Sequence, residues 1–531
     1  MGYGFFYLSS RKLWARIVRK SPFISTKNLL IDFVILLLAN TFVLADTPLA
    51  APPNQISNSG FTGTGKAQFT GWSQIDPTNP ATGGVDGADN YVSAAVTDNT
   101  KSAGIEQTIP IRPEWARVIL RGNIRVVFQN SGAGSTSPVT ADSPFVGVMV
   151  SWVDKTGHRT SVPNAQTWAY TTPGWVIVNQ MLDVPPGTTA MVLAPEVSKS
   201  SATASFKDLT LSAWVSTFQD GFSGSNLDPT RWSISLGKHN VRADEQQWFT
   251  ADSLTVTNNM LRIRATHQAE GGLPFQSGQV SSIYKFQQLF GIFEFQVKIP
   301  LVSGAWPAAY LLGWNDDWPP EVDVQEQSGR DTTDIRETNH YSDQYGRHRG
   351  SQGNFSMSGL DMTQFHTYTI AWEAGHMDWY FDGIYRSTTG LPYDDVSDVP
   401  MYMTMNLACG SYGGDTSQTP WPQDFFIKQV GVYQRSDLPL PVYPGDDQEI
   451  TLPQNTAKLS AITCNPLDSA LVNWTLIEGP ATVKIKDPHS VTTTATFSKP
   501  GMYRFEVKVT KGASTNNGQY LVYVNTAIAK S

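Results

Sequence analysis

The segment Glu321-Val322-Asp323-Val324-Gln325-Glu326 constrains the fold of this chain more than any other. It places three acids and two valines in six residues, and valines favour a β-strand. Side chains alternate between the two faces of a strand, so Glu321 and Asp323 share a face. One bulge residue between Asp323 and Glu326 would bring Glu326 to that face, and bulges are common beside active sites. We therefore predict a bulged strand that aligns three carboxylates.

Three aligned carboxylates indicate a functional strand, because like charges on one face of a sheet destabilise it. Glycoside hydrolysis needs two carboxyl groups around one bond: one ionised to attack, and one that holds a proton near neutral pH. A third acid between them raises the pKa of a neighbour by its charge. A solvated acidic edge, or half of a calcium site, would use the same three residues, so the surrounding sequence has to decide.

The sequence around the acids resembles glycoside hydrolase family 16 over about residues 216–436. The matching segments stand in the order that the family shows: Ser277-Gly278-Gln279-Val280-Ser281-Ser282, Phe290-Gly291-Ile292-Phe293-Glu294-Phe295, Gly304-Ala305-Trp306-Pro307, Asn339-His340-Tyr341, Asp378-Trp379-Tyr380-Phe381-Asp382-Gly383 and Pro400-Met401-Tyr402-Met403. The resemblance implies an all-β protein whose catalytic domain, 216–436, is a β-jelly-roll sandwich. It also implies a retaining, endo-acting mechanism in which Glu321 is the nucleophile, Glu326 the acid/base and Asp323 the electrostatic helper between them.

The spacing of the acids points to a branch of that family. Two residues between Asp323 and Glu326 resemble the laminarinase, agarase and carrageenase branches, whereas lichenases and xyloglucan-modifying enzymes have one residue fewer. A β-1,3-glucan of the laminarin type is therefore the expected substrate and partner, with galactans of the agarase or carrageenase type behind it. A transglycosylase, which shares the covalent intermediate, and a non-catalytic glycan-binding protein stay open as alternatives.

Four further residues are expected to contact the substrate: Trp306, Trp318, His340 and Asn406. The two tryptophans bracket the approach to the acid strand, and their rings suit the apolar faces of sugar rings, with core packing as the alternative. His340 matches a cleft position of the family. Asn406 alternates with Tyr402 and Thr404, so these three could line one face of a strand.

Three positions depart from the family pattern. Gln279 stands where many members have arginine, and Pro320 stands where many have glycine. Gln429 occupies a position where the family often has an aspartate that helps to hold a structural calcium ion. We therefore predict no metal and no cofactor, and structural calcium is not part of the prediction.

Residues 1–45 are interpreted as a targeting segment. Basic residues from Arg11 to Lys27 precede an apolar run from Phe33 to Leu44, which has the length of a signal peptide and is short for a membrane span. Cleavage near Asp46 or Ala51 would give a secreted protein, and an uncleaved signal anchor would give a cell-surface one.

Two smaller β-sandwich domains are expected to flank the catalytic domain. Residues 46–215 show short alternating apolar runs bounded by turn residues and weakly resemble carbohydrate-binding modules. The aromatic residues there that could stack on sugars are Trp72, Trp152, Trp168, Tyr170 and Trp175, with core packing as the alternative for each. Residues 437–444 are rich in proline and are predicted to be a linker. Residues 445–531 resemble immunoglobulin-like modules of the polycystic-kidney-disease type, with Trp474 in the core.

Composition and charge restrict the partners. The net charge is −8, so neither nucleic acid nor an anionic membrane is a natural partner, and no integral membrane partner is expected unless residues 1–45 remain as an anchor. Cys409 and Cys464 fall in different predicted domains, so we expect no disulfide between them, and Cys409 reads as a small buried apolar residue. A monomer is expected.

Overall fold

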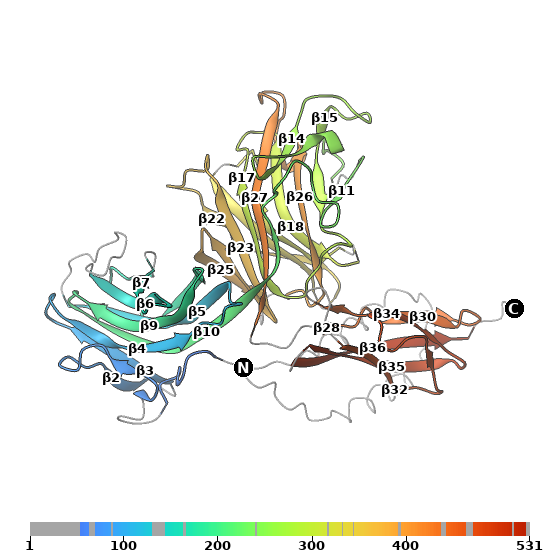
Figure 1. The fold of residues 1–531 in the computed structure, drawn as a ribbon. Coiled ribbons are helices and arrows are strands. Elements are labelled where there is room, and N and C mark those ends of the chain that lie inside the picture. Colours follow the sequence, from blue (N-terminus) through green and yellow to red (C-terminus); the bar gives the residue numbers. More distant parts are fainter. Residues whose placement is uncertain are drawn as a thin grey trace.

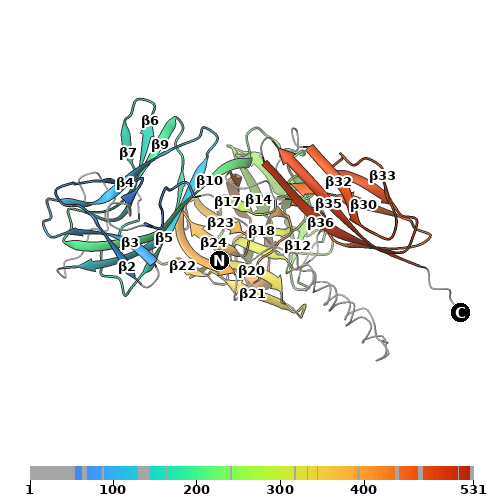
Figure 2. The same cartoon turned by 90° about the horizontal axis from the view of Figure 1, so that it is seen from below.

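The computed structural model describes residues 54–526, apart from 63–68, 87–88, 130–143, 163–165, 239–241, 316–317, 332, 344, 391–394, 437–441, 464–470 and 512–513. The predicted targeting segment 1–45, the cleavage positions near Asp46 and Ala51, and Cys464 lie outside the described residues. The described chain is built almost wholly of β-strands, which form three sandwiches side by side (Figures 1 and 2). The prediction of an all-β protein with a jelly-roll sandwich between two smaller β-sandwich domains is confirmed.

The N-terminal sandwich, described residues 54–215, packs two sheets around one core. The first sheet has the order β1 (Ser73–Gln74), β4 (Ser102–Pro110), β9 (Thr188–Ser198), β6 (Phe145–Asp154) and β7 (Arg159–Ser161). The second has the order β8 (Val176–Asp183), β5 (Arg117–Phe128), β10 (Ala202–Asp220), β3 (Asp89–Val96) and β2 (Thr82–Asp86). Alternate residues of β5, Val118 and Leu120, enter the core between the sheets, as the period of a strand requires.

The central sandwich, residues 216–436, contains the acid strand. One sheet has the order β11 (Ser233–Ile234), β16 (Gln279–Ser281), β26 (Met401–Cys409), β18 (Ala305–Gly313), β19 (Glu321–Glu326), β20 (Asp334–Ser342) and β21 (His348–Gln352), and β22 (Phe355–Ser356) pairs with β20. The facing sheet has the order β13 (Leu254–Thr257), β14 (Met260–Ala265), β27 (Gln423–Arg435), β17 (Gly291–Lys298), β23 (His366–Glu373), β24 (His376–Phe381) and β25 (Ile384–Gly390). A separate pair, β12 (Gln247–Phe249) and β15 (Phe275–Ser277), and two short 3-10 helices, η2 (Ala251–Ser253) and η3 (Ser411–Gly413), complete it.

The C-terminal sandwich, described residues 442–526, is the smallest. Its main sheet has the order β29 (Gln448–Thr451), β36 (Ser514–Asn525), β35 (Gly501–Lys511) and β32 (Leu471–Glu478). The facing sheet has the order β30 (Thr456–Ser460), β34 (Thr492–Thr496) and β33 (Lys484–Ile485), and β28 (Val442–Tyr443) pairs with β31 (Ile462–Thr463). Trp474 is buried in this core, as predicted.

The structure differs from the sequence-based division at both edges of the central sandwich. The predicted boundary between residues 215 and 216 falls inside β10, which is one continuous strand from Ala202 to Asp220. In the linker 437–444, residues 442–443 form β28, and the ring of Tyr443 lies 5.9 Å from that of Trp314 in the central sandwich. Both flanking sandwiches are therefore attached through ordered contacts.

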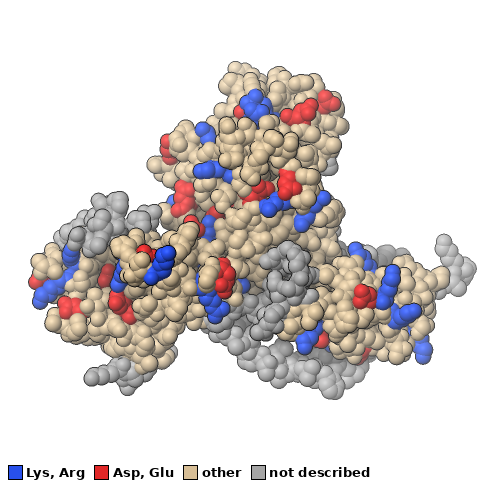
Figure 3. Space-filling view, viewed as in Figure 1, with Lys and Arg blue, Asp and Glu red and all other residues tan. Residues whose placement is uncertain are grey.

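Cys409 is fully buried, in agreement with the prediction, and burial raises the pKa of its thiol. In the part of the chain that the structure describes, no helix has the length and apolar character needed to cross a membrane. On the face drawn in Figure 3, basic and acidic side chains are interspersed over the described residues of all three sandwiches, so this face carries no extended basic surface of the kind that binds nucleic acid.

Candidate active site

The acid strand β19 lies inside its sheet between β18 and β20. Asp323 pairs with Tyr310 of β18 and Glu326 pairs with Ala308, although two residues lie between the acids and a regular strand needs an odd number between residues on one face. The pairing shifts by one residue between these two positions. The bulge that the sequence predicts is therefore present, and it brings Glu326 to the same face as Glu321 and Asp323.

The two faces of β19 have opposite character. Val322 and Val324 are fully buried and join the core between the two sheets. On the other face, the neighbours of the acids come from β18, β20 and β26. They are Trp306 and Tyr310 on β18, Arg336, Thr338 and His340 on β20, and Tyr402, Thr404 and Asn406 on β26. The valines thus anchor the strand while the acids are displayed outside the core.

Each of the two glutamates accepts a hydrogen bond from a tryptophan. The indole Nε1–H of Trp318 donates to Glu321 Oε2 at 2.5 Å, and that of Trp306 donates to Glu326 Oε1 at 2.9 Å. The Trp318 side chain is still 54% exposed, which leaves ring surface free for a ligand. Both tryptophans therefore lie at the acids, and core packing, the alternative for them, does not describe either position.

A pair of histidines lies beside the middle acid. His340 Nε2 is 3.2 Å from Asp323 Oδ2, and His340 Nδ1 is 2.9 Å from Nε2 of His348 on β21. The Trp318 ring packs against the His348 ring with 4.6 Å between their centroids. When His348 Nε2–H donates a hydrogen bond to His340 Nδ1, a neutral His340 carries its own proton on Nε2, which is directed at Asp323.

Burial and mutual repulsion raise the pKa of all three acids. Burial and the charge of Asp323 raise the pKa of Glu321 to about 8, against which the Trp318 hydrogen bond acts. Burial and the charge of Glu326 raise the pKa of Asp323 well above its usual range, and burial raises the pKa of Glu326. Each of the three groups therefore holds a proton more readily than a free carboxyl group does, and a proton on Asp323 favours an ionised Glu321 by removing the repulsion between them.

Asn406 lies opposite Ala308, the neighbour of Glu326, on the same face as the acids. Its side-chain Oδ1 and the Oγ1 of Thr404 are buried and have no hydrogen-bond partner among the described residues. Gln279, the position of the expected arginine, pairs with Asn406 and donates to Ser235 Oγ at 2.9 Å.

Several residues near the acids were not anticipated from the sequence. Arg336 pairs with Glu326 across β19 and β20, and its guanidinium lies over the Tyr412 ring at 5.6 Å. The spacing Arg336, Thr338, His340 carries a period-two signal that could have identified Arg336. His348 and Tyr412 carry no such signal, because they reach the site from β21 and from η3.

The aromatic residues predicted to bind sugar in the N-terminal sandwich divide into two groups. Trp72, Trp152 and Trp168 are buried in its core, so core packing, the alternative given for each, describes these three. Tyr170 is 64% exposed. Trp175 lies under two cations, with Arg125 at 4.8 Å and Lys207 at 4.9 Å from its ring centroid, because this face of the sheet is rich in charge.

The calcium position of the family holds a hydrogen bond in this chain. Gln429 donates to Gln219 Oε1 at 2.9 Å. Within the described residues no group of three or more histidine, cysteine, aspartate or glutamate side chains could hold a metal ion.

Replacing Asp323 with asparagine should stabilise the protein more as the pH rises. The folded-state pKa of Asp323 lies above that of the unfolded chain, so the folded state binds more protons and loses stability as pH rises between the two values. We expect Asp323→Asn to melt at least about 2–4 °C above the parent at pH 8, the shift for one kcal/mol in a domain of this size, and close to the parent at pH 4.

Asp331→Asn is the matched control for that scan. A hydrogen bond from Thr333 lowers the pKa of Asp331 to about 2, so its contribution is present above the unfolded pKa and is lost as pH falls through about 2. This variant should be less stable than the parent at pH 8. Equal melting temperatures for Asp323→Asn and the parent at pH 8 would contradict the raised pKa.

Comparison with known proteins identifies two families. Residues 235–425 match the family model for glycosyl hydrolases family 16, and residues 444–524 match a family model for the PKD domain. The endo-1,3-1,4-beta-glycanase EglC of Rhizobium meliloti (strain 1021) is 32% identical over 229 residues, which cover 38% of this chain and 48% of the relative. The glucan endo-1,3-beta-glucosidase A1 of Niallia circulans is 26% identical over 255 residues, which cover 41% and 37%. The chain thus spans half or less of the length of these two curated relatives.

Among solved structures, the endo-beta-1,3-glucanase from Pyrococcus furiosus aligns with 25% identity and a TM-score of 0.38, covering 42% of this chain and 95% of that chain. The match to the family model contains the bulged strand β19 with its three acids and the strands β18, β20 and β26 around it. The chain therefore carries a glycoside hydrolase family 16 domain, followed by a PKD domain.

Proposed function

We propose that this protein is an endo-acting hydrolase of β-linked glucans that contain 1,3 linkages, and that it retains the configuration at the anomeric carbon. The observation that carries the proposal is the bulged strand β19, which displays Glu321, Asp323 and Glu326 on one face and gives each glutamate its own indole donor. Two separately held carboxyl groups with a third acid between them match the demands of glycoside hydrolysis.

In the first step Glu321 attacks the anomeric carbon while Glu326 protonates the leaving oxygen. The glycosidic C–O bond breaks, a bond forms between the anomeric carbon and a Glu321 oxygen, and the proton of Glu326 leaves with the released sugar. In the second step the Glu326 carboxylate takes a proton from water, whose oxygen displaces Glu321. Retention requires the two carboxyl groups to lie about 5–5.5 Å apart.

Asp323 and the histidine pair regulate the charge of the two reacting groups. Asp323 is only 5% exposed and contacts His340, so it can hold a proton that would otherwise sit on Glu321. His348 positions the His340 ring through the 2.9 Å contact. Trp306 and Trp318 hold the glutamate side chains in place by their hydrogen bonds.

The names of two relatives support the substrate class that we propose. The names of the two reported relatives describe action on 1,3-1,4-β-glycan and 1,3-β-glucan, and both share 1,3 linkages. We place this chain with them rather than with galactan hydrolases. Export of the protein, which residues 1–45 predict, belongs to the same proposal, because it would bring the enzyme to polysaccharide outside the cell.

A panel of laminarin, mixed-linkage β-glucan, agarose and carrageenan, assayed for new reducing ends, tests the substrate. We expect laminarin to give the fastest early fall in chain length, with mixed-linkage glucan second. Glu321→Gln, prepared in parallel, should remove the signal and so exclude contaminating enzymes. Faster release from agarose or carrageenan would overturn the glucan assignment. Longer oligosaccharides without new reducing ends would identify a transglycosylase instead.

A further inference from the structure

Eight strands from the N-terminal and central sandwiches close into a ring. β10 pairs with β5 through its first part and with β27 through residues 214–220. From β27 the pairing continues through β17, β23, β24 and β25. β25 then pairs with β8 at Ile384 and Gln180, and β8 pairs with β5. The ring therefore joins a face of the N-terminal sandwich to the outer face of the central sheet.

Alternate residues of these strands point into the ring. Its apolar part is one cluster of buried side chains: Ile119, Met181, Trp214, Ile292, Ala371, Tyr380 and Tyr433. The flanking members of the same alternation are polar, and they are Arg117 and Arg121 on β5, Asn179 on β8, Glu294 on β17, Glu373 on β23, Asp378 on β24 and Arg435 on β27. The interior is thus a second core, shared by two sandwiches.

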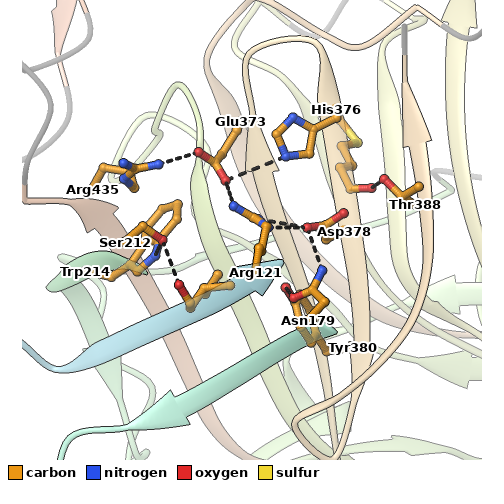
Figure 4. A network of polar contacts seen from close by, with 12 residues as sticks. Arg121, Asn179, Ser212, Trp214, Glu373, His376, Asp378, Tyr380, Thr388 and Arg435 are labelled. Carbon is orange, nitrogen blue, oxygen red and sulfur yellow. Dashed lines mark hydrogen bonds and ion pairs between the residues drawn. The ribbon is translucent and has the colours of Figure 1, made fainter. Parts of the chain in front are cut away.

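Two arginines of β5 reach across this interior to carboxylates of the central sheet. Arg117 makes a two-pronged contact with Glu294, at 2.5 and 2.7 Å, and both side chains are more than nine-tenths buried. Arg121 contacts Glu373 at 2.7 Å and Asp378 at 2.8 Å (Figure 4). Two-pronged contacts of this kind have both strength and a fixed geometry.

The network continues around the ring. Arg435 contacts the other oxygen of Glu373 at 2.7 Å, while Asn179 donates to Asp378 at 3.0 Å and accepts from the Tyr380 hydroxyl at 2.7 Å (Figure 4). Burial opposes the ionisation of Glu373, but Arg121 and Arg435 lower its pKa to about 2. The carboxylate is therefore charged at every pH at which the protein would be used.

The charges of the two halves complement one another. The N-terminal sandwich contributes two cations, Arg117 and Arg121, to the interior. The central sheet contributes three carboxylates, Glu294, Glu373 and Asp378, and one cation, Arg435. The buried groups of the two sandwiches thus sum to +2 and −2, although Arg117 also contacts the largely exposed Asp183 of its own sandwich at 2.8 Å. Without the other sandwich, Arg121 would lose both of its carboxylate partners and Glu294 its arginine, which is strongly unfavourable for buried charges.

We infer that the N-terminal sandwich is an obligate part of the catalytic unit, which folds and unfolds together with the central sandwich rather than as a tethered module. The strands that it covers, β17 and β23, place Phe293, Ile370 and Trp372 in the same core as Val322 and Val324 of the acid strand. The N-terminal sandwich therefore supports the sheet beneath the acids. The C-terminal sandwich has its own core and lies outside this ring.

Hydrogen exchange on the full chain tests the coupling without reference to activity. Leu120 is fully buried in the N-terminal core and faces away from the ring. Leu120→Ala therefore removes packing directly from the N-terminal sandwich and from no other part of the chain. If the unit is cooperative, amides of β17 and β23 should exchange about 30-fold faster or more, together with those of β5. Unchanged exchange in β17 and β23 while β5 accelerates would overturn the inference.

Val507→Ala is the matched control. Val507 is fully buried in the core of the C-terminal sandwich, so this variant should accelerate exchange in β35 and β32 and leave β17 and β23 unchanged. Acceleration of β17 and β23 in both variants would mean that the whole chain is one unit, and the specific role of the N-terminal sandwich would be wrong.

A second comparison separates the ring from ordinary surface pairs. Arg121→Met leaves Asp378 without its arginine partner and Glu373 with Arg435 alone of its two arginines. It should therefore lower the melting temperature of the full chain by at least about 6 °C. Arg125 lies on the same strand and pairs with Asp86 at 3.2 Å, but both side chains are substantially exposed. Arg125→Met should therefore change the melting temperature by less than about 2 °C. Adding Asp378→Asn to Arg121→Met should recover part of the loss. Equal shifts for the two arginine variants would contradict the proposal.

Discussion

Glu321→Gln should lower kcat on the best polysaccharide at least about 10⁴-fold and leave the substrate dissociation constant nearly unchanged. An amide has almost the shape of the carboxylate and still reaches Trp318, but it cannot form the covalent bond to the anomeric carbon. The loss should therefore appear in the chemical step and not in binding. Steady-state kinetics and calorimetric binding to a laminarin oligosaccharide measure the two quantities separately.

Glu337→Gln is the matched control for that substitution. Glu337 lies one residue from Arg336 on β20 but is completely buried, and burial raises its pKa well above the usual range. A neutral amide should therefore replace a neutral acid there at little cost to turnover. A Glu321→Gln variant that keeps more than about a tenth of the parent kcat would exclude Glu321 as the nucleophile, since a tenfold loss is only about 1.4 kcal/mol.

Glu326→Gln should lower kcat/KM on polysaccharide by about 10²–10⁴-fold, the range for loss of a general acid and base. An aryl β-glucoside with an acidic phenol as leaving group needs little protonation, so its first step should lose much less. The product-forming second step would remain slow, and a burst of phenol should appear. The alkaline limb of the bell-shaped pH profile should also disappear, because it reports the proton held by Glu326.

Equal losses on polysaccharide and on the activated aryl glucoside would contradict the role of Glu326 as the acid. Trp306→Phe offers a milder comparison in the same experiment. It removes the hydrogen bond that lowers the pKa of Glu326, so the alkaline limb should move to higher pH while the nucleophile is left intact.

The acid strand could be predicted from the sequence because each of its residues has a local requirement. Val322 and Val324 demand a buried face, and the acids demand the other face, so the bulge follows from the spacing alone. The order of the surrounding segments then identifies the domain. The positions of Trp306 and Trp318 near the acids could be predicted, but not their hydrogen bonds to Glu326 and Glu321, because these depend on side-chain direction.

The ring between the first two sandwiches could not be predicted, because its partners lie far apart in the chain. Arg121 and Glu373 are 252 positions apart, and Arg117 and Glu294 are 177 apart. On β5 the alternation of charged and apolar residues is that of a strand with one solvent-exposed face, and nothing local shows that this face is covered. The same limit applies to Trp72, Trp152 and Trp168, because the sequence pattern of an alternating strand is the same whether its tryptophan points into the core or toward a ligand.

The configuration of the first product tests the central claim most directly. If Glu321 forms a covalent intermediate and water displaces it, two inversions occur, and the reducing end released from a β-glucan must appear first as the β-anomer. Proton NMR during the first minutes of laminarin hydrolysis, before mutarotation mixes the anomers, distinguishes the two. We predict that the β-anomer signal rises first and the α-anomer follows. An initial α-anomer would show inversion and would contradict the assignment of Glu321 as the nucleophile.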